Sequence, residues 1–490
     1  MKNRFVVYGV LIVVAVGVAL FTLSKDTPPG RNPFALFGGP TTPATPWKPS
    51  AKLDAEANAE FKIETDRTDN VPLAGKPLQA DWPQFNGAKR DNKSSETGLL
   101  EKWPEGGPPL AWVSHGVGSG YSTVSVVDGV LYTMGNKGST EAIIALDAGT
   151  GEKIWSTPFA WASRLSNGDG PRSTPTVSGG AVYGLGGKGD VVCLDAKSGD
   201  IRWQTNILSE FGGSTPGWGT SESVLVDGNR VICTPGGDKA TIVALAAESG
   251  EVIWKFASPD ADDAAYASAI VIETDGLKQY VQLLEKGLVG LDAKTGAQLW
   301  RYTGIIKEYP NIPTPVSRKD VVYGATAKGL GGSVRLKRSG RGIEAAEIYA
   351  DAKLPRAIGG SVEVNGYLYG TGSEALMCVD FNTGELKWQA RGVGTGSVCY
   401  ADGRLYVHAE KPPGEMALVE ATPEEYREHG RFTPTDGPEN RIADVGGQAE
   451  EGGKAKKVGD GKTWAYPTIA NGRLYIRDWI CLWCYDIKAK

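Results

Sequence analysis

A ten-residue unit that ends in an aromatic ring recurs along this chain and constrains its fold more than any other feature. Each unit has an apolar residue and usually Asp, then a short turn with Gly, and then Trp. The five copies are residues 146–155, 194–203, 245–254, 291–300 and 379–388. Successive copies lie roughly 45–50 residues apart, with about twice that distance before the last, and this period is typical of one four-stranded propeller blade.

Every position of the unit has a physical explanation. The Asp carboxylate can accept backbone N–H groups of the turn, and the Gly supplies the positive φ that closes a hairpin. The Trp ring is large enough to fill the wedge between two blades. The residue before each Leu-Asp pair is small, which predicts tight packing; these residues are Ala145, Cys193, Ala244, Gly290 and Cys378.

A second repeated sequence pattern, at the start of each blade, predicts the number of blades. Each blade should open with an innermost strand, and these openings align on a downstream element such as Gly129-Val130-Leu131-Tyr132. The aligned slots are mainly small hydroxyls: Thr123, Thr174, Ser223, Ser268, Thr314, Gly360, Ser397 and Tyr466. Eight openings predict an all-β, eight-bladed β-propeller of four-stranded antiparallel blades. Residues 334–349 and 418–432 are interpreted as degenerate copies of the unit, in blades five and seven.

The two ends of this repeat region predict how the ring closes. Leu110-Ala111-Trp112-Val113 resembles an outer strand, yet no blade precedes it, and the chain ends after residues 482–486, one strand short of a blade. We therefore expect the N-terminal strand to complete the last blade, because closure removes exposed sheet edges.

Composition narrows the function classes. The chain has 490 residues, 41% hydrophobic content, 66 Gly and 14 Trp, which suits a turn-rich β protein. Its net charge of −5, without basic runs, argues against nucleic acid as a partner. Only His115, His408 and His429 are present and they are scattered, which argues against a His-rich metal site or a His-based triad.

The N-terminal region predicts export. Residues 5–23 form an apolar run that follows Lys2 and Arg4, long enough to span a bilayer. We expect residues 1–23 to be an uncleaved transmembrane signal anchor, with a cleaved signal peptide as the alternative. Residues 24–80 are rich in Pro and charge and predict a disordered tether to a propeller over 81–490. The protein should thus be membrane-anchored and face the periplasm or the cell exterior.

The loops predict the working face. The Asp-Gly hairpins are tight, whereas connections between blades are longer; they include residues 157–171, 205–220, 258–266, 303–311 and 433–462. Binding residues concentrate on loops of a rigid scaffold. The candidates at this channel mouth are Asp169, Arg172, Trp218, Ser221, Glu222, Tyr266, Asn311, Arg356, Trp464 and Tyr466. The alternative is that these groups only line a water-filled channel, with Asp169 and Arg172 pairing to order a loop.

The cysteines and one acidic stretch favour structural interpretations. Cys193, Cys378 and Cys484 occupy small blade slots, so buried free thiols are expected rather than disulfides. The Cys481-x-x-Cys484 pair falls in an apparent strand and lacks the His of a haem attachment motif. Residues 441–462 predict a solvated or disordered excursion, with a partner-docking loop as the alternative.

These units carry a family resemblance. Residues 194–203 and 291–300 resemble the quinoprotein-type repeat of eight-bladed propellers that bind pyrroloquinoline quinone, and of their non-enzymatic relatives. Residues 81–84, 170–177 and 472–478 are similar to sequence segments of exported bacterial members of this family. The resemblance covers residues 81–490, and it implies the fold more firmly than any activity.

The resemblance implies two functions. Quinoprotein alcohol dehydrogenases use Ca²⁺ to polarise the quinone, an Asp as base, a Trp beneath the quinone and often an adjacent Cys pair. This chain has no adjacent Cys pair, although Glu222, Asn311 and Asp169 could form a calcium cage with Trp218 or Trp464 beneath the quinone. The other branch resembles the propeller lipoprotein of the outer-membrane β-barrel assembly machinery, a docking scaffold.

From the residues that are present and absent, we predict a monomeric binding scaffold with no catalytic residues. Its partner would be an envelope protein or a small ligand at the loop face. A dehydrogenase that depends on pyrroloquinoline quinone and calcium is the alternative.

Overall fold

The computed structural model describes residues 65–68, 81–165, 167–308, 310–340, 342–435, 450–451, 454–455 and 463–489. The predicted anchor lies outside these ranges, as does the predicted tether except for residues 65–68. Most of the predicted excursion at 441–462 lies outside them too. In the described ranges, no helix is both long and apolar enough to cross a membrane.

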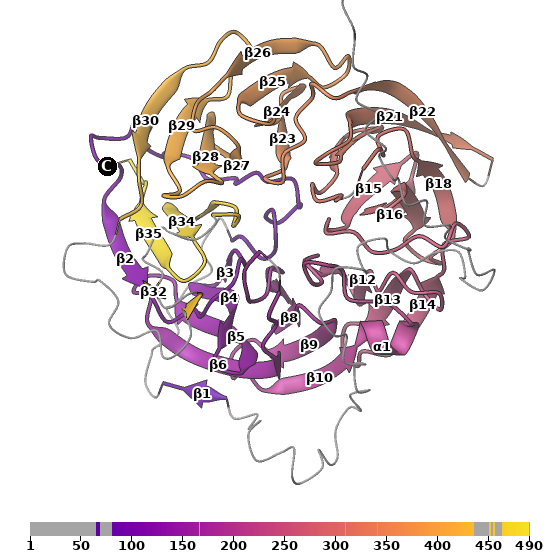
Figure 1. The fold of residues 1–490 in the computed structure, drawn as a ribbon, viewed down its shortest axis with the longest axis horizontal. Helices are drawn as coiled ribbons and strands as arrows, with labels where there is room; N and C mark the ends of the chain where they lie inside the picture. The colour runs from indigo at the N-terminus through magenta and orange to yellow at the C-terminus, as the bar shows by residue number, and fades with distance from the viewer. Residues whose placement is uncertain are drawn as a thin grey trace, which may run out of the picture.

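Eight antiparallel sheets stand around a central axis, which confirms the predicted eight-bladed propeller (Figure 1). Blades 1 and 2 are β3 Ser125–Val127, β4 Val130–Lys137, β5 Thr140–Asp147, β6 Lys153–Trp161, and β7 Thr176–Ser178, β8 Ala181–Leu185, β9 Asp190–Asp195, β10 Ile201–Asn206. Blades 3 and 4 are β11 Leu225–Asp227, β12 Arg230–Cys233, β13 Ile242–Ala246, β14 Val252–Phe256, and β15 Ile270–Thr274, β16 Leu277–Leu284, β17 Gly287–Asp292, β18 Gln298–Tyr302.

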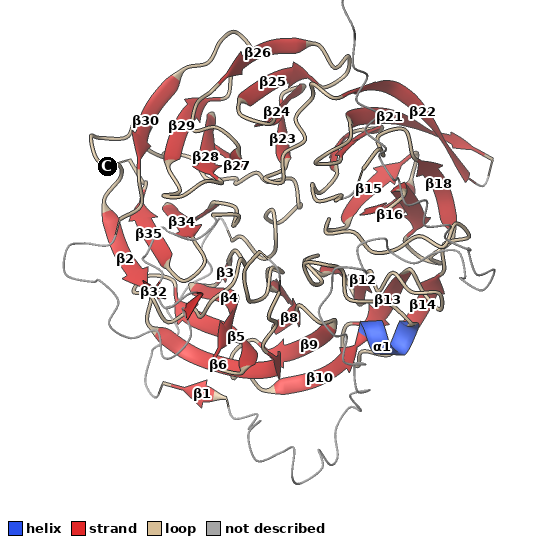
Figure 2. Ribbon diagram, in the orientation of Figure 1, coloured by secondary structure: helices blue, strands red, loops and turns tan. Residues whose placement is uncertain are grey.

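The other half of the ring repeats this order. Blades 5 and 6 are β19 Val316–Arg318, β20 Val321–Ala325, β21 Gly331–Ser339, β22 Gly342–Asp351, and β23 Ser361–Val364, β24 Tyr367–Thr371, β25 Leu376–Asp380, β26 Leu386–Ala390. Blades 7 and 8 are β27 Gly396–Ala401, β28 Arg404–Ala409, β29 Met416–Glu420, β30 Glu428–Phe432, and β33 Thr468–Ala470, β34 Arg473–Arg477, β35 Leu482–Asp486, β2 Leu110–Ser114. The short helix α1 Ile207–Phe211, drawn in blue in Figure 2, follows β10, and β31 Glu450–Glu451 pairs with β32 Lys454–Ala455 in a separate two-stranded sheet.

The ring closes as the sequence predicts. Strand β2 pairs antiparallel with β35, with Trp112 opposite Cys484. The outermost strand of blade 8 therefore comes from the N-terminal part of the propeller and its three inner strands from the C-terminal part. The indole Nε1 of Trp112 also donates to the carbonyl of Ala148 in blade 1, at 3.1 Å, so this strand joins two blades.

The repeated unit forms the contact between neighbouring blades. Asp147 Oδ1 accepts from the backbone N–H groups of Gly149 and Thr150, at 2.9 and 2.8 Å, and this shapes the turn. At the next seam, the carbonyl of Ala196 in blade 2 accepts from two blade 1 side chains, Trp155 Nε1 and the Tyr132 hydroxyl, each at 3.2 Å. The Trp thus fills the wedge between blades, as predicted.

The small residue before Leu-Asp faces this Trp across the sheet. Ala145 pairs with Trp155, Cys193 with Trp203 and Gly290 with Trp300. A Cβ on Gly290 would lie 2.0 Å from the Trp300 ring, so the ring itself sets the size limit. All six cysteines are buried thiols and none of them is in a disulfide, which confirms the prediction of buried thiols.

The turn glycine tests this packing. Gly199 has φ +75°, and a Cβ there would lie 2.7 Å from the Trp155 ring of the preceding blade. Gly199→Ala should lower the free energy of unfolding by about 2–4 kcal/mol, because left-handed backbone and overpacking both add cost. Urea denaturation measures this change. Gly179→Ala is the control, since Gly179 has φ +57° but an open surrounding and should lose only about 1 kcal/mol. Equal losses would contradict the packing role.

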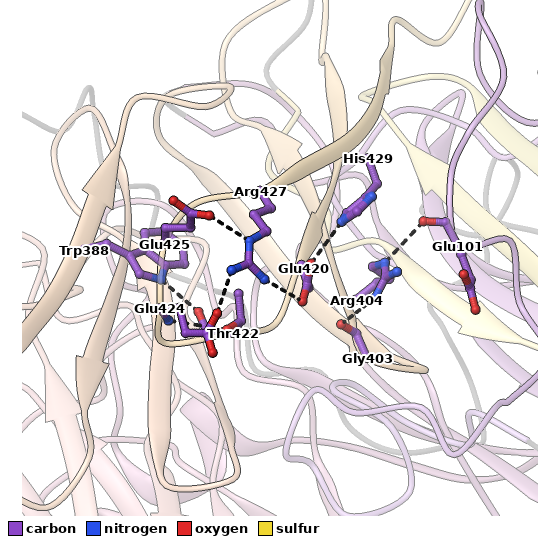
Figure 3. Close-up of polar contacts among 10 residues, drawn as sticks. All are labelled: Glu101, Trp388, Gly403, Arg404, Glu420, Thr422, Glu424, Glu425, Arg427 and His429. Atoms are coloured by element: carbon purple, nitrogen blue, oxygen red, sulfur yellow. Dashed lines mark hydrogen bonds and ion pairs between the residues drawn. The ribbon is translucent and has the colours of Figure 1, made fainter.

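The two degenerate blades replace different parts of the unit. In blade 5, Tyr349 takes the place of the Trp and donates to the Phe381 carbonyl at 2.9 Å. In blade 7, the turn between β29 and β30 carries a charge network instead of Asp-Gly (Figure 3). Arg427 contacts three carboxylates there: Glu420, Glu424 and Glu425, at 3.3, 2.6 and 2.9 Å.

Candidate functional site

A segment that precedes the repeats crosses the central axis of the ring. This strap, residues 82–94, is part of the indigo chain that crosses the centre of Figure 1. Trp82 pairs with Val126 of blade 1, and the Pro83 carbonyl accepts from Val177 of blade 2 at 2.7 Å. On the opposite side, the Asn92 carbonyl accepts from Tyr400 of blade 7 at 3.0 Å.

A buried arginine fixes the middle of the strap. The Arg90 side chain, 3% exposed, donates to the Ser223 and Val224 carbonyls of blade 3, at 2.6 and 3.2 Å. Burial lowers the pKa of Arg90 to about 10, so the group remains charged at neutral pH. The strap therefore contacts the inner strands of blades 1, 2, 3 and 7.

The strap makes the two faces of the ring unequal. In every blade, the innermost strand runs from the inter-blade connection toward the first hairpin turn. We call the face with these connections the connection face and the other the hairpin face. The strap bonds to β3 and β7 near their hairpin ends, at Val126 and Val177, so it crosses the axis on the hairpin side. The expected open channel is thus obstructed there, and the connection face carries the candidate site.

The hydroxyl register at the inner strands is structural. The backbone N–H of Thr174 donates to Ser223 Oγ at 2.9 Å, and that of Ser223 to Ser268 Oγ at 2.9 Å. Ser268 N–H donates in turn to Thr314 Oγ1 at 3.2 Å. Each small hydroxyl thus joins its blade to the preceding one, which explains the pattern without a ligand.

The structure gathers three predicted site residues around Tyr121. The Arg172 guanidinium lies over the Tyr121 ring, 5.3 Å from its centre, and donates to the Gly168 and Gly170 carbonyls of its own loop. Trp464 packs on the same ring, with centroids 4.8 Å apart. The Asp169 carbonyl accepts from Trp479 Nε1 at 2.9 Å. Burial lowers the pKa of Arg172, while Tyr121 and Tyr266 oppose that shift electrostatically.

A second aromatic pair lies on the connections of blades 3 and 4. The half-buried Trp218 stacks on the buried Tyr266, with centroids 5.1 Å apart and an angle of 25°. Tyr266 N–H donates to the Asn311 carbonyl at 3.0 Å. Arg356 donates instead to the Ala352 and Ala327 carbonyls. Ser221 bonds the Gly219 carbonyl at 3.2 Å. These aromatic rings and Arg172 make the connection face suited to stacking and to anions.

The side chains of Tyr466 and Glu222 make their contacts within the protein. The Tyr466 ring packs edge-on against Phe85 of the strap, and its hydroxyl donates to the Ile358 carbonyl at 3.0 Å. Glu222 is 4% exposed and accepts from the backbone and the hydroxyl of Thr234 and from Gln282. Burial raises the pKa of Glu222 to about 7.

The suggested calcium cage is not assembled by these residues. The Asn311 amide donates to the Leu284 and Glu285 carbonyls at 2.8 and 2.7 Å, and Asp169 Oδ1 accepts from Leu165 N–H at 3.0 Å. Glu222 faces Thr234 and Gln282. In the part of the chain that the structure describes, no group of three or more His, Cys, Asp or Glu could hold a metal ion. The donor set of these three residues therefore does not fit Ca²⁺.

Sequence reasoning missed a set of buried polar residues on the second strand of several blades. They lie two residues after an aromatic or its equivalent, and they bond the opening of the next blade. Thr371 Oγ1 donates to the Gly396 carbonyl at 2.8 Å, and His408 Nδ1 lies 3.1 Å from the Ala465 carbonyl. Arg477 donates to the Ser122 carbonyl at 3.0 Å. Their recurrence after Tyr369, Tyr406 and Tyr475 is the signal that could have revealed them.

One of these residues predicts a pH effect. Because a carbonyl only accepts, His408 Nδ1 carries the proton, and burial lowers the pKa of His408 from 6.5 to about 4. The unfolded chain therefore takes up this proton first as the pH falls. The stabilising effect of neutral His408 is present above pH 6.5 and is lost between pH 6.5 and 4, about 3 kcal/mol in all.

His408→Gln should remove this acid sensitivity while its amide still donates to Ala465. The difference in unfolding free energy between wild type and variant should shift by about 3 kcal/mol in favour of the variant from pH 6.5 to 4. Urea denaturation across this range measures it. Buried Glu141 and Glu222 titrate in both proteins and cancel in the difference. A constant difference would contradict the assignment.

The fold and this site define an eight-bladed propeller with a strap at its axis and an aromatic connection face. A family model described as outer membrane protein assembly factor BamB matches residues 139–365. The BamB protein of Escherichia coli (strain K12) is 30% identical over 141 residues, which are 28% of this chain and 31% of that protein. The quinone-dependent alcohol dehydrogenase subunit of Gluconacetobacter polyoxogenes is 28% identical over 193 residues, 36% of this chain and 25% of that protein.

These alignments span less than a third of the length of either relative. Among solved structures, the quinohemoprotein alcohol dehydrogenase from Comamonas testosteroni aligns with a TM-score of 0.55 and 14% identity. That alignment covers 84% of this chain and 81% of the other, and at this identity it shows the fold alone. Over residues 139–365, the chain is thus similar to the pyrroloquinoline-quinone-like β-propeller repeat family.

Proposed function

We propose that this protein is an exported, membrane-tethered binding scaffold that holds a protein or small-ligand partner on its connection face. The proposal rests on which side chains of this face are hydrogen-bonded within the protein and which remain accessible. Glu222, Asn311 and Asp169 are engaged by the fold, whereas Trp218 remains half-buried on its stacked Tyr266. Rigid aromatic side chains of this kind are typical anchors of binding interfaces.

Two further features support binding on this face. Ser173 Oγ, Thr174 Oγ1 and Asn311 Oδ1 are buried polar atoms on the connections that have no hydrogen-bond partner among the described residues, and such atoms are commonly satisfied by water or a ligand. The BamB relatives are by name assembly factors for outer membrane proteins. A scaffold would need no reacting centre, in keeping with the occupied carboxylates.

Quinone-dependent oxidation of alcohols is the second candidate, because relatives of that name match part of the chain. It requires a cation, a base and a flat quinone held together. The described residues place aromatic rings on the connection face, but they do not place three His, Cys, Asp or Glu side chains close enough together to bind a metal ion. The geometry therefore favours the scaffold.

Site-specific photo-crosslinking in cells tests the proposal. A photoreactive residue at Trp218 or Gly217 on the connection face should give a discrete protein adduct or, with a small ligand, an adduct of defined added mass. The same residue at Lys197 or Asn382 on the hairpin face is the matched control, and these positions should give none. Adducts only from the hairpin face, or none from either face, would overturn the proposal.

A further inference from the structure

The outer edge of blade 1 carries a fifth strand. Strand β1 Asp66–Arg67 pairs antiparallel with β6, with Asp66 opposite Ser156 and Arg67 opposite Trp155. Thr68 N–H donates to the Ile154 carbonyl at 2.9 Å. No other blade has an added strand in the described residues. The predicted tether thus contributes a short strand to the rim of the ring (Figure 1).

Two ion pairs join this strand to the ring. Asp66 pairs with Lys153 of β6, and Arg67 pairs with Asp200 on the neighbouring hairpin of blade 2. The Thr65 hydroxyl lies 3.1 Å from that of Thr157. The added strand therefore presents an acid to blade 1 and a base to blade 2, across the seam between them.

The charge pattern is particular to this edge. Lys153 lies two residues before the blade Trp, and in the other copies of the unit that slot holds Ile201, Val252, Gln298 and Leu386, with Leu110 in β2. An extended backbone is accepted by any sheet edge, so selectivity must come from side chains. The acid–base pair supplies it in blade 1.

The edge is also short. Thr68 bonds Ile154, and alternate residues of a strand direct their backbone groups to one side, so residues 154, 156 and 158 face outward. Residue 158 is Pro, which has no N–H to donate, and the register of β6 with β5 shifts just beyond it. The edge therefore accepts a segment of only a few residues.

The occupant is held weakly. The side chains of both ion pairs are between 32% and 63% exposed, and exposed pairs of this kind contribute little. Residues 65–68 are joined to the ring through residues 69–80, so their advantage over a competitor comes mainly from being in the same chain. Such a strand can be exchanged.

We propose that the outer edge of β6 is a strand-addition site for a short extended segment of another protein with adjacent acidic and basic residues, for which residues 65–68 are the built-in competitor. The acid pairs with Lys153 and the base with Asp200. This site lies on the rim, so it stands independently of the function proposed for the connection face.

A labelled peptide copying residues 62–70 tests the site by fluorescence anisotropy on the full-length chain in detergent. In the variant Asp66→Lys/Arg67→Glu the competitor loses both ion pairs. We expect this variant to bind the peptide at least 10-fold more tightly than wild type, because a tethered competitor acts at roughly millimolar effective concentration. Lys153→Glu/Asp200→Lys should bind at least 10-fold more weakly than that variant.

Two controls make the outcome decisive. A peptide with Lys and Glu in place of the acid and base should bind Lys153→Glu/Asp200→Lys better than the original peptide does. Lys255→Glu, at an exposed site on β14, combined with Asp66→Lys/Arg67→Glu, should leave peptide affinity unchanged. Unchanged melting temperatures exclude unfolding as the cause. Peptide affinity that is absent from Asp66→Lys/Arg67→Glu, or insensitive to the charges at 153 and 200, overturns the proposal.

Discussion

Deletion of residues 1–116 is expected to abolish cooperative folding rather than to trim the ring. The deletion removes β2, whose pairing with β35 completes blade 8, and the strap. It also removes Trp82, Leu99 and Trp103, which are at most 4% exposed. Burying each such side chain stabilises the fold by about 2–3 kcal/mol, and the loss of these three side chains and a closing strand approaches the whole stability of a typical domain.

Deletion of residues 1–80 is the matched control. It removes β1, whose two ion pairs are exposed, but keeps the strap and β2. We expect this protein to unfold cooperatively with a melting temperature within a few degrees of wild type. Calorimetry and near-ultraviolet circular dichroism measure both deletions. A sharp, unshifted transition after deletion to residue 116 would show that the ring closes without its N-terminal strand.

The second large effect is expected at Arg477, on strand β34. Arg477 is 1% exposed, and its guanidinium donates to the carbonyl of Met134 in blade 1 at 2.7 Å and to those of Val117 and Gly118, in the connection from β2 to β3, at 3.3 and 3.1 Å. It also donates to Ser122 and Thr133. Arg477→Met should lower the free energy of unfolding by about 3–5 kcal/mol, because several buried acceptors lose their donor. Burial lowers the pKa of Arg477 to about 10, which still leaves it charged at neutral pH.

Arg477→Lys should recover little of this loss of unfolding free energy, because a Lys ammonium cannot reproduce the planar set of donors of a guanidinium. Arg473→Met on the same strand is the control. Its ion pair with Asp486 spans 3.6 Å and is partly exposed, so the loss should stay below about 1 kcal/mol. Urea denaturation compares the three variants. Similar values for residues 473 and 477 would contradict the joining role of Arg477.

Periodic features were predictable from the sequence, and aperiodic ones were not. The Trp unit and the hydroxyl register repeat once per blade, so they revealed the blades, the closing strand and the small slot opposite each Trp. The strap has no repeat partner. Its path follows from single contacts such as Arg90 with Ser223, and no pattern in the sequence marks them.

The site was predictable in part for the same reason. Loop position predicted Arg172 and Trp464 at one mouth, and both side chains contact the ring of Tyr121, which lies in no repeated motif. Glu222 was assigned to the mouth by its position before a strand. A position does not fix the direction of a side chain, and Thr234 with Gln282 draws this carboxyl into the interior.

We propose that the connection face binds a partner and does not oxidise alcohols. Dye-linked oxidation, measured on the purified protein with added pyrroloquinoline quinone and Ca²⁺ over a panel of alcohols and sugars, tests it most directly. We predict no alcohol-dependent dye reduction, and we predict that Glu222→Ala and Asp169→Ala change stability or partner docking and no turnover. Robust alcohol-dependent dye reduction that is lost on replacing Glu222 or Asp169 would contradict the scaffold and establish the dehydrogenase.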